Sequence, residues 1–552
     1  MVRRGLIFYS IVFCLFALIG CGSSDDTTKN TNTEIKNKSS KKTDNSPVDG
    51  DWLIYHMGSE PGTLNPIIAR DRAESIINSN NIYESLIKRD NESLELKPQL
   101  AKSWEISDDK LTFTFKLRDD VFWHDGKPFT SEDIVFSYNT IMDPKVDSAQ
   151  LKGYYQEIKK VEAIDKHTVK FTYARPYFLA LEFCGGIPIV PKHIFDKGDF
   201  NKNPAGRHPI GTGPYKFSKW ETGREIILDK NEDYWGESPK LQKLVFKIIN
   251  DSNVAFQVLR KGELDLAGLT PIQWEKQSKT KKFEDIFDKY SYFRPNYSYI
   301  GWNIDRPFFS DKRVRTAMSH LVNKELILQK ILYNLGATVT NPFYIKSKEY
   351  DKTIKPIKYS PESAIALLNE AGWIDTNSDG IRDKDGVKFE FEFLVPNGSD
   401  TSEKISTILK EEMDKAGIRM NIRKIEWAVF VQRLNERKFD AVTLSWSMGV
   451  ETDPYQIWHS SQKSSGGSNF VGFDNAEADR LIEEARQEFD SEKRTKLYKK
   501  FANIIHDEQP YTFLFCGKSP IAVNKRFENV NVYPLGVDFL EWYVPAELQK
   551  YH

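Results

Sequence analysis

The residues best suited to bind a ligand lie in the stretch from Phe439 to Ser461. Its first part, Asp440 to Trp446, is a mostly apolar run of β-favouring residues that is too short for a typical helix, which predicts a buried strand. Two carboxylates, Glu451 and Asp453, follow in a predicted loop. The aromatic residues on either side of them are Trp446, Tyr455 and Trp458. Acidic groups between aromatic walls suit a cationic or amphipathic ligand, because the rings exclude water and strengthen charge interactions, although the pattern also fits a buried strand followed by a solvated acidic turn.

Motifs typical of enzymes do not accompany these residues. The chain has no G-x-S-x-G, no H-E-x-x-H and no P-loop, since Gly517-Lys518-Ser519 lacks the glycine required five residues earlier. Its nine histidines are scattered, without a pair at metal-ligand spacing. The 78 Lys and Arg against 79 Asp and Glu leave a net charge of −1, which gives no electrostatic reason to expect nucleic acid. We therefore predict a binding protein, with an envelope hydrolase as a minor alternative.

The N-terminus begins with two arginines and a short apolar run from Leu6 to Ile19. The run is shorter than the roughly 20 residues that span hydrocarbon, which favours a cleaved signal peptide over residues 1–20. Leu18 to Cys21 resembles the lipobox of bacterial lipoproteins, in which the cysteine is diacylated and becomes the mature N-terminus. An ordinary secretory signal with an incidental cysteine is the alternative. Two acyl chains on Cys21 would anchor the protein stably to a membrane.

The next segment, up to Gly50, is rich in Ser, Thr, Asn, Asp and Lys and has almost no apolar residues. Such a composition cannot form a core, so residues 21–50 are predicted to be a flexible tether with a typical reach of roughly 30 Å. Folded sequence begins near Asp51. Two cysteines remain in this body, Cys184 and Cys516, and we expect both to be buried thiols, with their pairing left open.

Hydrophobic periodicity predicts an α/β body. Residues 111–117 alternate between apolar and polar side chains, which is typical of a half-buried strand. Further strands are predicted at 52–55, 388–394, 418–426, 440–446 and 511–515, and helices at 73–86, 133–141, 360–373, 404–415, 476–489 and 494–505. Thr130, Asp311 and Ser360 are predicted helix N-caps. The strand-helix-strand order from 388 to 446 indicates a lobe with some parallel pairing.

A short acidic stretch matches the first nine positions of an EF-hand loop. Its oxygen ligands at positions 1, 3, 5 and 9 are Asp375, Asn377, Asp379 and Asp383. Position 12 is Gly386, so the bidentate glutamate is missing, and a strand-like run follows where a second helix is required. Two interpretations stay open: a structural Ca²⁺ that takes a carboxylate from elsewhere, or an acidic hairpin closed by Asx turns. Apart from this possible Ca²⁺, no cofactor is expected.

The block from Leu100 to Asn139 resembles the signature segment of the family 5 extracellular solute-binding proteins, the oligopeptide, dipeptide and nickel-binding receptors of bacterial ABC importers. Further motifs resemble the family in the same order: Glu60 to Pro66 (EPGTLNP), Pro209 to Tyr215 (PIGTGPY), Lys230 to Gly236 (KNEDYWG), Gly262 to Asp265 (GELD) and Asp311 to Arg315 (DKRVR). The resemblance covers roughly residues 51–545. Gly211 and Gly213 would permit a tight crossing where the chain passes between lobes.

This resemblance implies an α/β, two-lobed periplasmic-binding-protein fold of type II, similar to cluster C, with a small extra domain in the first lobe. The implied division is signal peptide 1–20, lipidated cysteine and tether 21–50, first lobe 51–88 with 210–303 and 515–552, inserted domain 89–209, and second lobe 304–514. It also implies that a solute, expected to be an oligopeptide, is captured between the lobes and delivered to the permease subunits of an importer. The protein would be an extracytoplasmic monomer, lipid-anchored to a bacterial membrane, in the periplasm or at the cell surface.

Several binding residues follow from the resemblance. Trp427 and Trp446 match positions that line the cleft in peptide-binding relatives, although each also fits a core tryptophan. Tyr154 or Tyr155 would face the cleft from the small domain. In the peptide receptors an aspartate three residues after the second tryptophan pairs with the peptide amino group, whereas this chain has Gly449 there. Glu451 or Asp453 would have to replace that aspartate from a longer loop.

The missing aspartate leaves other solutes open. A neutral or differently charged ligand, such as an oligosaccharide or an opine-like compound, is the alternative within the same fold. A sensory or scaffold lipoprotein of the cell envelope is the alternative from another class.

Overall fold

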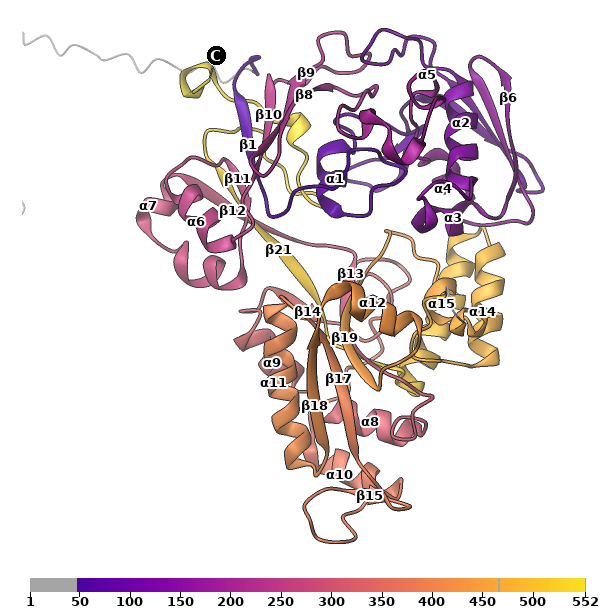
Figure 1. The fold of residues 1–552 in the computed structure, drawn as a ribbon, viewed down its shortest axis with the longest axis vertical. Helices are drawn as coiled ribbons and strands as arrows, with labels where there is room; N and C mark the ends of the chain where they lie inside the picture. Colours follow the sequence, from indigo (N-terminus) through magenta and orange to yellow (C-terminus); the bar gives the residue numbers. More distant parts are fainter. Residues whose placement is uncertain (1–46, 465–466, 552) are drawn as a thin grey trace, which may run out of the picture. The chain divides into compact units, whose positions relative to one another are not determined.

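The structure is a computed structural model that describes residues 47–464 and 467–551. The predicted signal peptide, Cys21 and most of the predicted tether lie outside the described residues. Within these two ranges, no helix has the length and apolar character needed to cross a bilayer. The three largest sheets have eight, four and five strands. We call the regions built on them the first lobe, the small domain and the second lobe (Figure 1).

The first lobe is built on the eight-stranded sheet, in the order β12-β21-β11-β1-β10-β9-β8, with β14 added beside β21. β1 pairs in parallel with β10 and β11, and the other neighbours are antiparallel. Its strands are β1 (Trp52–Met57), β8 (Tyr215–Glu221), β9 (Glu225–Lys230), β10 (Lys243–Ile248), β11 (Leu266–Gly268), β12 (Phe287–Phe293), β14 (Gly336–Thr338) and β21 (Phe515–Asn524). Its helices are α1 (Arg72–Asn78), α6 (Ser252–Arg260), a π-helix (Gln273–Gln277) and α7 (Lys281–Glu284).

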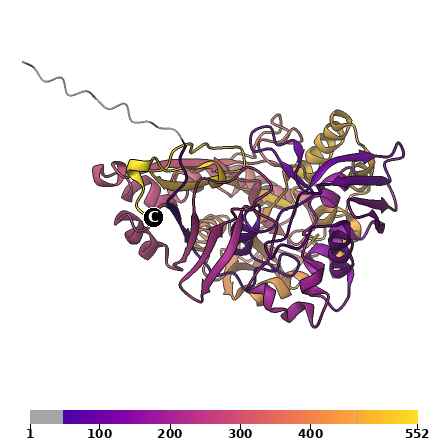
Figure 2. The same cartoon turned by 90° about the horizontal axis from the view of Figure 1, so that it is seen from above.

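The small domain carries the four-stranded antiparallel sheet, in the order β4-β5-β7-β6. Its elements are β4 (Ala101–Ile106), β5 (Thr112–Leu117), α2 (Ser131–Met142), α3 (Ala149–Tyr155), β6 (Ile158–Asp165), β7 (Thr168–Tyr173), α4 (Ala180–Gly185) and α5 (Lys192–Phe195). The short pair β2 (Ile87–Arg89) and β3 (Leu96–Pro98) leads into it. The alternation predicted for β5 is confirmed, with Phe113, Phe115 and Leu117 buried. In Figure 2 this domain lies at the opposite side from the pink helices α6 and α7.

The second lobe has the five-stranded sheet, in the order β18-β17-β19-β13-β20, in which β17 pairs in parallel with both β18 and β19. This confirms the predicted parallel pairing. The strands are β13 (Asn296–Trp302), β17 (Glu390–Pro396), β18 (Arg419–Ile425), β19 (Ala441–Ser447) and β20 (Tyr511–Phe513), beside a hairpin of β15 (Asp383–Lys384) and β16 (Val387–Lys388). The helices are α8 (Lys312–His320), α9 (Lys324–Lys330), α10 (Pro361–Glu370), α11 (Asp400–Lys415), α12 (Trp427–Asn435), α13 (Tyr455–Trp458), α14 (Ala476–Gln487) and α15 (Ser491–Glu508).

Short 3₁₀ turns complete the assignment, at Phe200–Lys202, Pro204–Gly206, Ser460–Lys463, Phe539–Glu541 and Ala546–Leu548. The three predicted N-caps are confirmed. Thr130 and Asp133 form a capping box on α2, while Asp311 and Ser360 accept hydrogen bonds from the first turns of α8 and α10.

One apolar core runs through both the first lobe and the small domain, from Leu53 of β1 to Phe171 of β7. The second-lobe sheet is covered on both faces instead. Neighbouring residues of β13 show this, because Tyr299 belongs to one core and Ile300 to another. Cys184 and Cys516 are both free and buried, which confirms the expectation of buried thiols.

Consecutive strands of the two large sheets follow one another directly at two adjacent places. β12 of the first lobe ends at Phe293 and β13 of the second lobe begins at Asn296, so the first crossing is Arg294-Pro295. The second is Leu514, between β20 and β21. The boundary predicted at 303 is therefore too late, because residues 296–302 already pair with β19 and β20. The Cys516 thiol donates a hydrogen bond to the carbonyl oxygen of Arg294 at 3.2 Å, which links the two crossings.

Gly211 and Gly213 lie where the chain leaves the small domain and re-enters the first lobe, and not at a crossing between the two large sheets. The segment leads from the small domain into β8, and a Cβ on either glycine would overlap the carbonyl oxygens of Ile82 and Asn81. The backbone N–H of Gly213 donates to the Ile82 carbonyl at 2.9 Å. The glycines therefore permit close backbone packing. His124 closes the same segment, since it accepts from the Gly211 N–H and its other ring nitrogen lies 3.0 Å from the Gly213 carbonyl oxygen.

The predicted helix over 73–86 is too long, because α1 ends at Asn78. Asn80 adopts a left-handed backbone with φ +59°, and the Asn81 amide donates to the carbonyl oxygens of Ile76 and Ile77. These contacts satisfy the last carbonyl groups of the helix and turn the chain away.

A buried arginine joins the ends of the folded body. Arg526 donates to the Asp265 carboxylate at 3.0 and 2.7 Å, to Asp51, and to the Trp52 carbonyl oxygen. Asp265 also accepts from the Ile54 N–H. The aspartate of the GELD motif thus binds the guanidinium that fixes the C-terminal segment beside β1.

Candidate ligand-binding cleft

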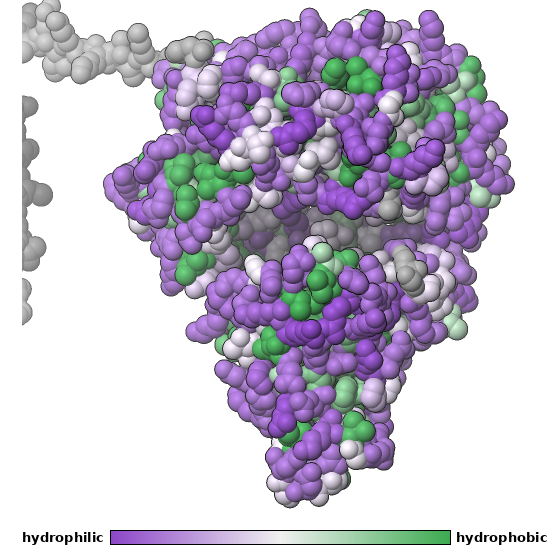
Figure 3. All heavy atoms as spheres, in the orientation of Figure 1, coloured by the Kyte–Doolittle hydropathy of each residue, from purple (hydrophilic) through white to green (hydrophobic). Residues whose placement is uncertain are grey.

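A cavity of about 490 Å³ lies beside the two crossings, in the hollow between the upper and lower masses in Figure 3. We call it the crossing end of the cleft. First-lobe residues form most of the wall, and the second lobe contributes Leu332 and Leu335. The remaining lining is Tyr55, His56, Met57, Gly58, Ser59, Arg72, Ala73, Ile76, Leu266, Gly268, Leu269, Pro271, Tyr292, Arg294, Gly517, Lys518, Ser519, Pro520 and Ile521.

Strand pairing fixes the positions of the basic side chains in this cavity. Lys518 of β21 is paired with Phe293 of β12, and its ammonium lies 5.2 Å from the centre of the Phe293 ring. Arg294 follows at once in the first crossing and donates to the Tyr292 hydroxyl at 3.2 Å. Arg72 is exposed at the start of α1. Three separate parts of the chain therefore bring cations to one place.

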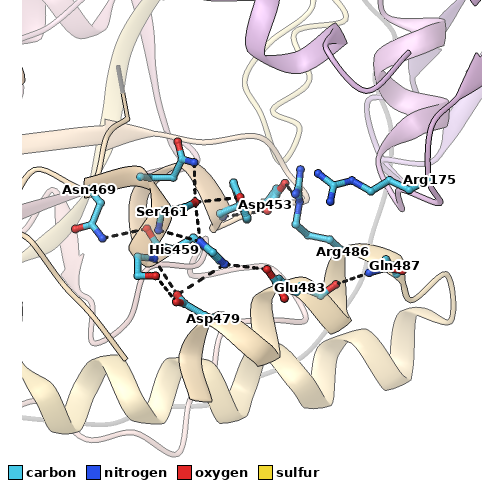
Figure 4. Close-up of polar contacts among 12 residues, drawn as sticks. Arg175, Asp453, His459, Ser461, Asn469, Asp479, Glu483, Arg486 and Gln487 are labelled. Carbon is cyan, nitrogen blue, oxygen red and sulfur yellow. Dashed lines mark hydrogen bonds and ion pairs between the residues drawn. The ribbon is translucent and has the colours of Figure 1, made fainter. Parts of the chain in front are cut away.

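The opposite end of the cleft is closed by contact between the small domain and the second lobe. We call this the small-domain end. A cavity of about 130 Å³ there is lined by Glu157, Arg175, Pro176, Tyr177, Tyr455, Glu483, Arg486 and Gln487. Figure 4 shows Arg175 extending from the small domain toward Arg486 of α14. The Phe178 N–H donates to the Arg486 carbonyl oxygen at 2.9 Å, a backbone bond between the two regions.

Asp453, one of the two predicted amine-binding carboxylates, lies in this contact. Its carboxylate accepts from Nε of Arg486 at 2.8 Å and from the Tyr177 hydroxyl at 3.1 Å, and both partners of the ion pair are largely buried. The Arg486 guanidinium also lies over the rings of Tyr177 and Tyr455, at 5.0 and 4.2 Å. Burial and the Asp453 carboxylate raise the pKa of Tyr177, so the hydroxyl stays a donor.

Glu451, the other predicted carboxylate, is also paired. Its Oε2 accepts from Arg494 of α15 at 3.0 Å, and the buried Arg494 guanidinium lies 4.4 Å from the Phe178 ring centre. Glu182 of the small domain is paired with Arg89, and burial raises the pKa of Glu182 against the opposing charge of that arginine. Glu182, Asp453 and Glu451 therefore each have an arginine partner.

The predicted aromatic residues differ in how much surface they present. Trp446 is half-buried and stacked between Tyr299 and Phe470, with ring centres 6.4 and 5.9 Å away. Trp427 begins α12 and is 54% exposed. Tyr155 is only 3% exposed and lies in the core, whereas Tyr154 is largely exposed, so only Tyr154 of this pair has surface for a ligand. The binding roles of these residues stay predictions.

The EF-hand-like loop is held by hydrogen bonds of its own. Asp375 accepts from the N–H groups of Asp379 and Gly380, and Asp383 accepts from the backbone and hydroxyl of Thr376. Asp379 pairs with Lys388, and the loop leads into the β15–β16 hairpin. Across residues 47–464 and 467–551, no group of three or more His, Cys, Asp or Glu is arranged to hold a metal ion. The contacts suit the Asx-turn interpretation, and Ca²⁺ binding stays a prediction.

Sequence reasoning missed Tyr177, Arg486 and Arg494. Tyr177 and Asp453 are 276 residues apart, and no local pattern links them. Arg486 and Arg494 lie on amphipathic helices that carry several other basic residues, so residue type alone does not single them out. The adjacent aromatic residues Tyr177 and Phe178, outside every predicted helix and strand, are the one local signal.

Two α/β lobes joined by two adjacent crossings, with a cleft beside those crossings, define a two-lobed solute-binding protein of type II. Residues 95–469 match the family described as bacterial extracellular solute-binding proteins, family 5 Middle, and the chain belongs to this family. Its members are transport receptors and not enzymes, as predicted.

Individual relatives support the same assignment. The oligopeptide-binding protein AppA of Bacillus subtilis is 33% identical over 514 residues, which cover 91% of this chain and 93% of AppA. The structure of that protein with a nonapeptide aligns at a TM-score of 0.78 and 31% identity, over 90% of this chain and all of AppA. NikZ of Campylobacter jejuni, solved with Ni(L-His), aligns at 0.76 and 28% identity over 89% of this chain and 99% of NikZ.

Proposed function

We propose that this chain is the extracytoplasmic receptor of an ABC importer, and that it captures an oligopeptide between its lobes and delivers it to the permease. The observation that carries this proposal is the alignment with peptide-bound AppA over all of that chain. In this proposal the ligand would lie in the cleft between the lobes. NikZ supports the alternative of a non-peptide solute, because the same fold there holds a metal complex of an amino acid.

Closure of the lobes would depend on the two crossings. Arg294-Pro295 and Leu514 are the short segments that join consecutive strands of the two large sheets, so small changes in a few backbone angles there would move one lobe against the other. A ligand that touches both lobes binds the closed form better and shifts the population toward it. The permease would then distinguish the liganded, closed receptor from the open one.

For the amino group of the peptide, Glu451 is the stronger candidate. Asp453 is enclosed by Arg486 and Tyr177, whereas Glu451 is 39% exposed and uses only Oε2 with Arg494. Its second oxygen can accept from an ammonium group. Trp446 and the exposed Trp427 would supply aromatic walls.

The proposal includes attachment to the membrane. Cys21 would carry two acyl chains after removal of residues 1–20, and the tether would keep a monomeric body in the periplasm or at the cell surface. Expression of the full chain and of Cys21→Ser, followed by detergent phase partitioning, tests this. The unchanged chain should enter the detergent phase and the variant the aqueous phase, while equal partitioning would contradict lipidation.

A thermal-shift screen of residues 51–552 tests the solute. Free peptides of about two to nine residues, their N-acetylated forms, sugars and Ni(L-His) are compared, since a ligand at a hundredfold excess over Kd adds about 2.7 kcal/mol to the free energy of unfolding. A rise in melting temperature with free peptides supports the proposal. A rise only with another solute would keep the receptor fold and reject the peptide.

A further inference from the structure

A second hollow lies outside the cleft and is formed in part by the C-terminal segment. Its inner part is a cavity of about 290 Å³, and a larger cavity of about 650 Å³ adjoins it. Among residues 47–464 and 467–551, neither cavity shares a lining residue with the crossing end or the small-domain end of the cleft. We call the two cavities together the C-terminal groove. The residues that line both of its parts are Lys88, Asn91, Tyr234, Asp538, Leu540 and Glu541.

Two half-buried carboxylates, Asp538 and Glu541, lie together in this shared wall, and we call them the acid pair. Nδ2 of Asn91 donates to Oδ2 of Asp538 at 2.8 Å and to Oε1 of Glu541 at 3.4 Å, so one amide group lies between the two acids. Within the described ranges, neither carboxylate forms an ion pair. Two negative charges this close repel each other, and a cation that binds between them relieves the repulsion.

Hydrogen bonds fix the positions of the acid pair without neutralising its charge. The Tyr533 hydroxyl donates to the Glu541 carboxylate, and Asp538 accepts from the Leu540 N–H at 3.0 Å. The hydrogen bond to Glu541, together with burial, raises the pKa of Tyr533 to about 12, so the hydroxyl stays a donor at neutral pH. The site is therefore built before any ligand arrives.

A buried amide oxygen without a partner belongs to the wall of the inner cavity. Gln99 lines this cavity and is only 6% exposed, and its Nε2 donates to Glu84 at 3.2 Å and to Asn80 at 3.1 Å. Glu84 also accepts from Tyr234 and Trp235, so the carboxylate is held in place and keeps Nε2 facing it. Oε1 of Gln99 has no hydrogen-bond partner. A buried acceptor of this kind is costly unless a donor reaches it.

The lining of the groove favours an organic cation. An alkylammonium group carries three N–H donors and no acceptor, which suits the acid pair and Gln99. Ca²⁺ takes about six to eight oxygen ligands, and no group of three or more His, Cys, Asp or Glu in the described residues is arranged to hold a metal ion. Asp90 and Glu92 add negative charge to the inner cavity, and Glu237 lies in the outer one. A ligand with ammonium groups along a flexible chain would reach both parts.

The cations of the groove leave the acid pair without a partner. Arg89 is paired with Glu182, and Lys240 of the outer cavity is paired with Asp49. Lys88 is exposed and, among the residues that the structure describes, forms no ion pair. Its charge opposes that of a bound cation, so its removal should strengthen binding.

We propose that the C-terminal groove binds a linear polyamine, with one ammonium group held by Asp538, Glu541 and Gln99 and another near Glu237. This site is separate from the cleft and does not depend on the proposed peptide function. The receptor would hold a polyamine and its transported solute at the same time.

Calorimetric titration with spermidine, putrescine and methylamine at constant ionic strength tests the proposal. Spermidine should bind with a stoichiometry of about one and more tightly than putrescine, and methylamine should bind most weakly. Glu541→Gln should weaken spermidine binding about tenfold, because it removes a charge-assisted hydrogen bond. Glu263→Gln is the matched control, since it removes an exposed glutamate outside the groove. Lys88→Gln should tighten the binding.

Asp538→Asn keeps the acceptor for Leu540 and serves as a second variant, and melting curves without ligand establish that each variant is folded. Spermidine binding that both Glu541→Gln and Asp538→Asn leave unchanged would place the polyamine elsewhere and overturn the proposal. Equal losses in Glu541→Gln and Glu263→Gln would also overturn it. Binding of Ca²⁺ or Mg²⁺ that is lost in these variants, without binding of spermidine, would replace the polyamine with a metal ion.

Discussion

The two ends of the cleft use charge in opposite ways. At the small-domain end, Asp453 and Glu451 are neutralised by Arg486 and Arg494, and the same arginines contact Tyr177 and Phe178 of the small domain. At the crossing end, the lining of the cavity has cations and, among residues 47–464 and 467–551, no carboxylate. Charges at the first end thus hold two regions of the protein together, while charges at the second are available to a ligand.

The largest effect on stability is expected from breaking the ion pair between Asp453 and Arg486 at the small-domain end. Arg486→Gln leaves the Asp453 carboxylate largely buried without its guanidinium, and loss of one partner of a buried pair costs about 3 to 5 kcal/mol of stability. Urea unfolding measures the difference. Arg480→Gln on the same helix is the control, because its ion pairs are exposed and contribute little to stability. Equal losses in the two variants would show that Asp453 and Arg486 are not a buried pair.

The stability of the protein is also expected to depend on pH, because the buried face of α1 carries a glutamate. Burial raises the pKa of Glu74 to about 7, from 4.5. Between these values the folded state binds more protons than the unfolded chain, so stability falls as pH rises through this window, by about 3 kcal/mol in total.

Glu74→Gln should remove this fall, as measured by urea unfolding at about pH 5 and about pH 8. Glu92→Gln, an exposed position outside α1, should retain it. An unchanged pH profile in Glu74→Gln would place the titrating group elsewhere.

A smaller effect is expected from the hydrogen bond between the regions. Tyr177→Phe removes only the donor to Asp453, which costs about 1.5 kcal/mol and favours the open form. Small-angle scattering without ligand should show a larger radius of gyration for this variant. Tyr154→Phe, also in the small domain but exposed, should scatter like the unchanged protein. If both variants behave alike, the Tyr177 contact does not hold the cleft closed.

The smallest effect concerns the predicted amine contact. Glu451→Gln should weaken free-amine peptides by about 1 kcal/mol, because the contact is partly exposed and shared with Arg494. N-acetylated peptides should bind both proteins equally in the same titration. A loss that is identical for free and acetylated peptides would remove Glu451 from the amine site.

The family, the lobes and the main elements follow from local sequence. The strand over 440–446, the loop after it and the capped helices each depend on residues close together in the chain, and the structure has them where they were predicted. The side-chain pairings that define the cleft do not follow from local sequence. Asp453 meets Tyr177 across 276 residues and Asp265 meets Arg526 across 261, and periodicity carries no information about such partners.

The errors in the predicted bounds have the same cause, which is contact between residues far apart in the chain. The lobe boundary predicted at 303 is too late because β13 pairs with β20, a strand some 200 residues later in the chain. The helix predicted to reach residue 86 ends earlier because the Asn81 side chain stabilises a turn. Gly213 packs against the backbone of this turn. Tyr155 shows why binding residues are hard to predict from sequence. It is buried while its neighbour Tyr154 is exposed, and the sequence alone does not distinguish the two.

The position of β21 has a consequence for the order of folding. This strand lies inside the first-lobe sheet, between β12 and β11, yet it is formed by residues 515–524. A chain synthesised from its N-terminus can complete the small domain and much of the second lobe early, but the first lobe lacks an interior strand and Arg526 until synthesis is nearly finished. We therefore expect an incomplete chain to remain loosely folded around β1, in a form that a translocation channel accepts and a protease digests readily.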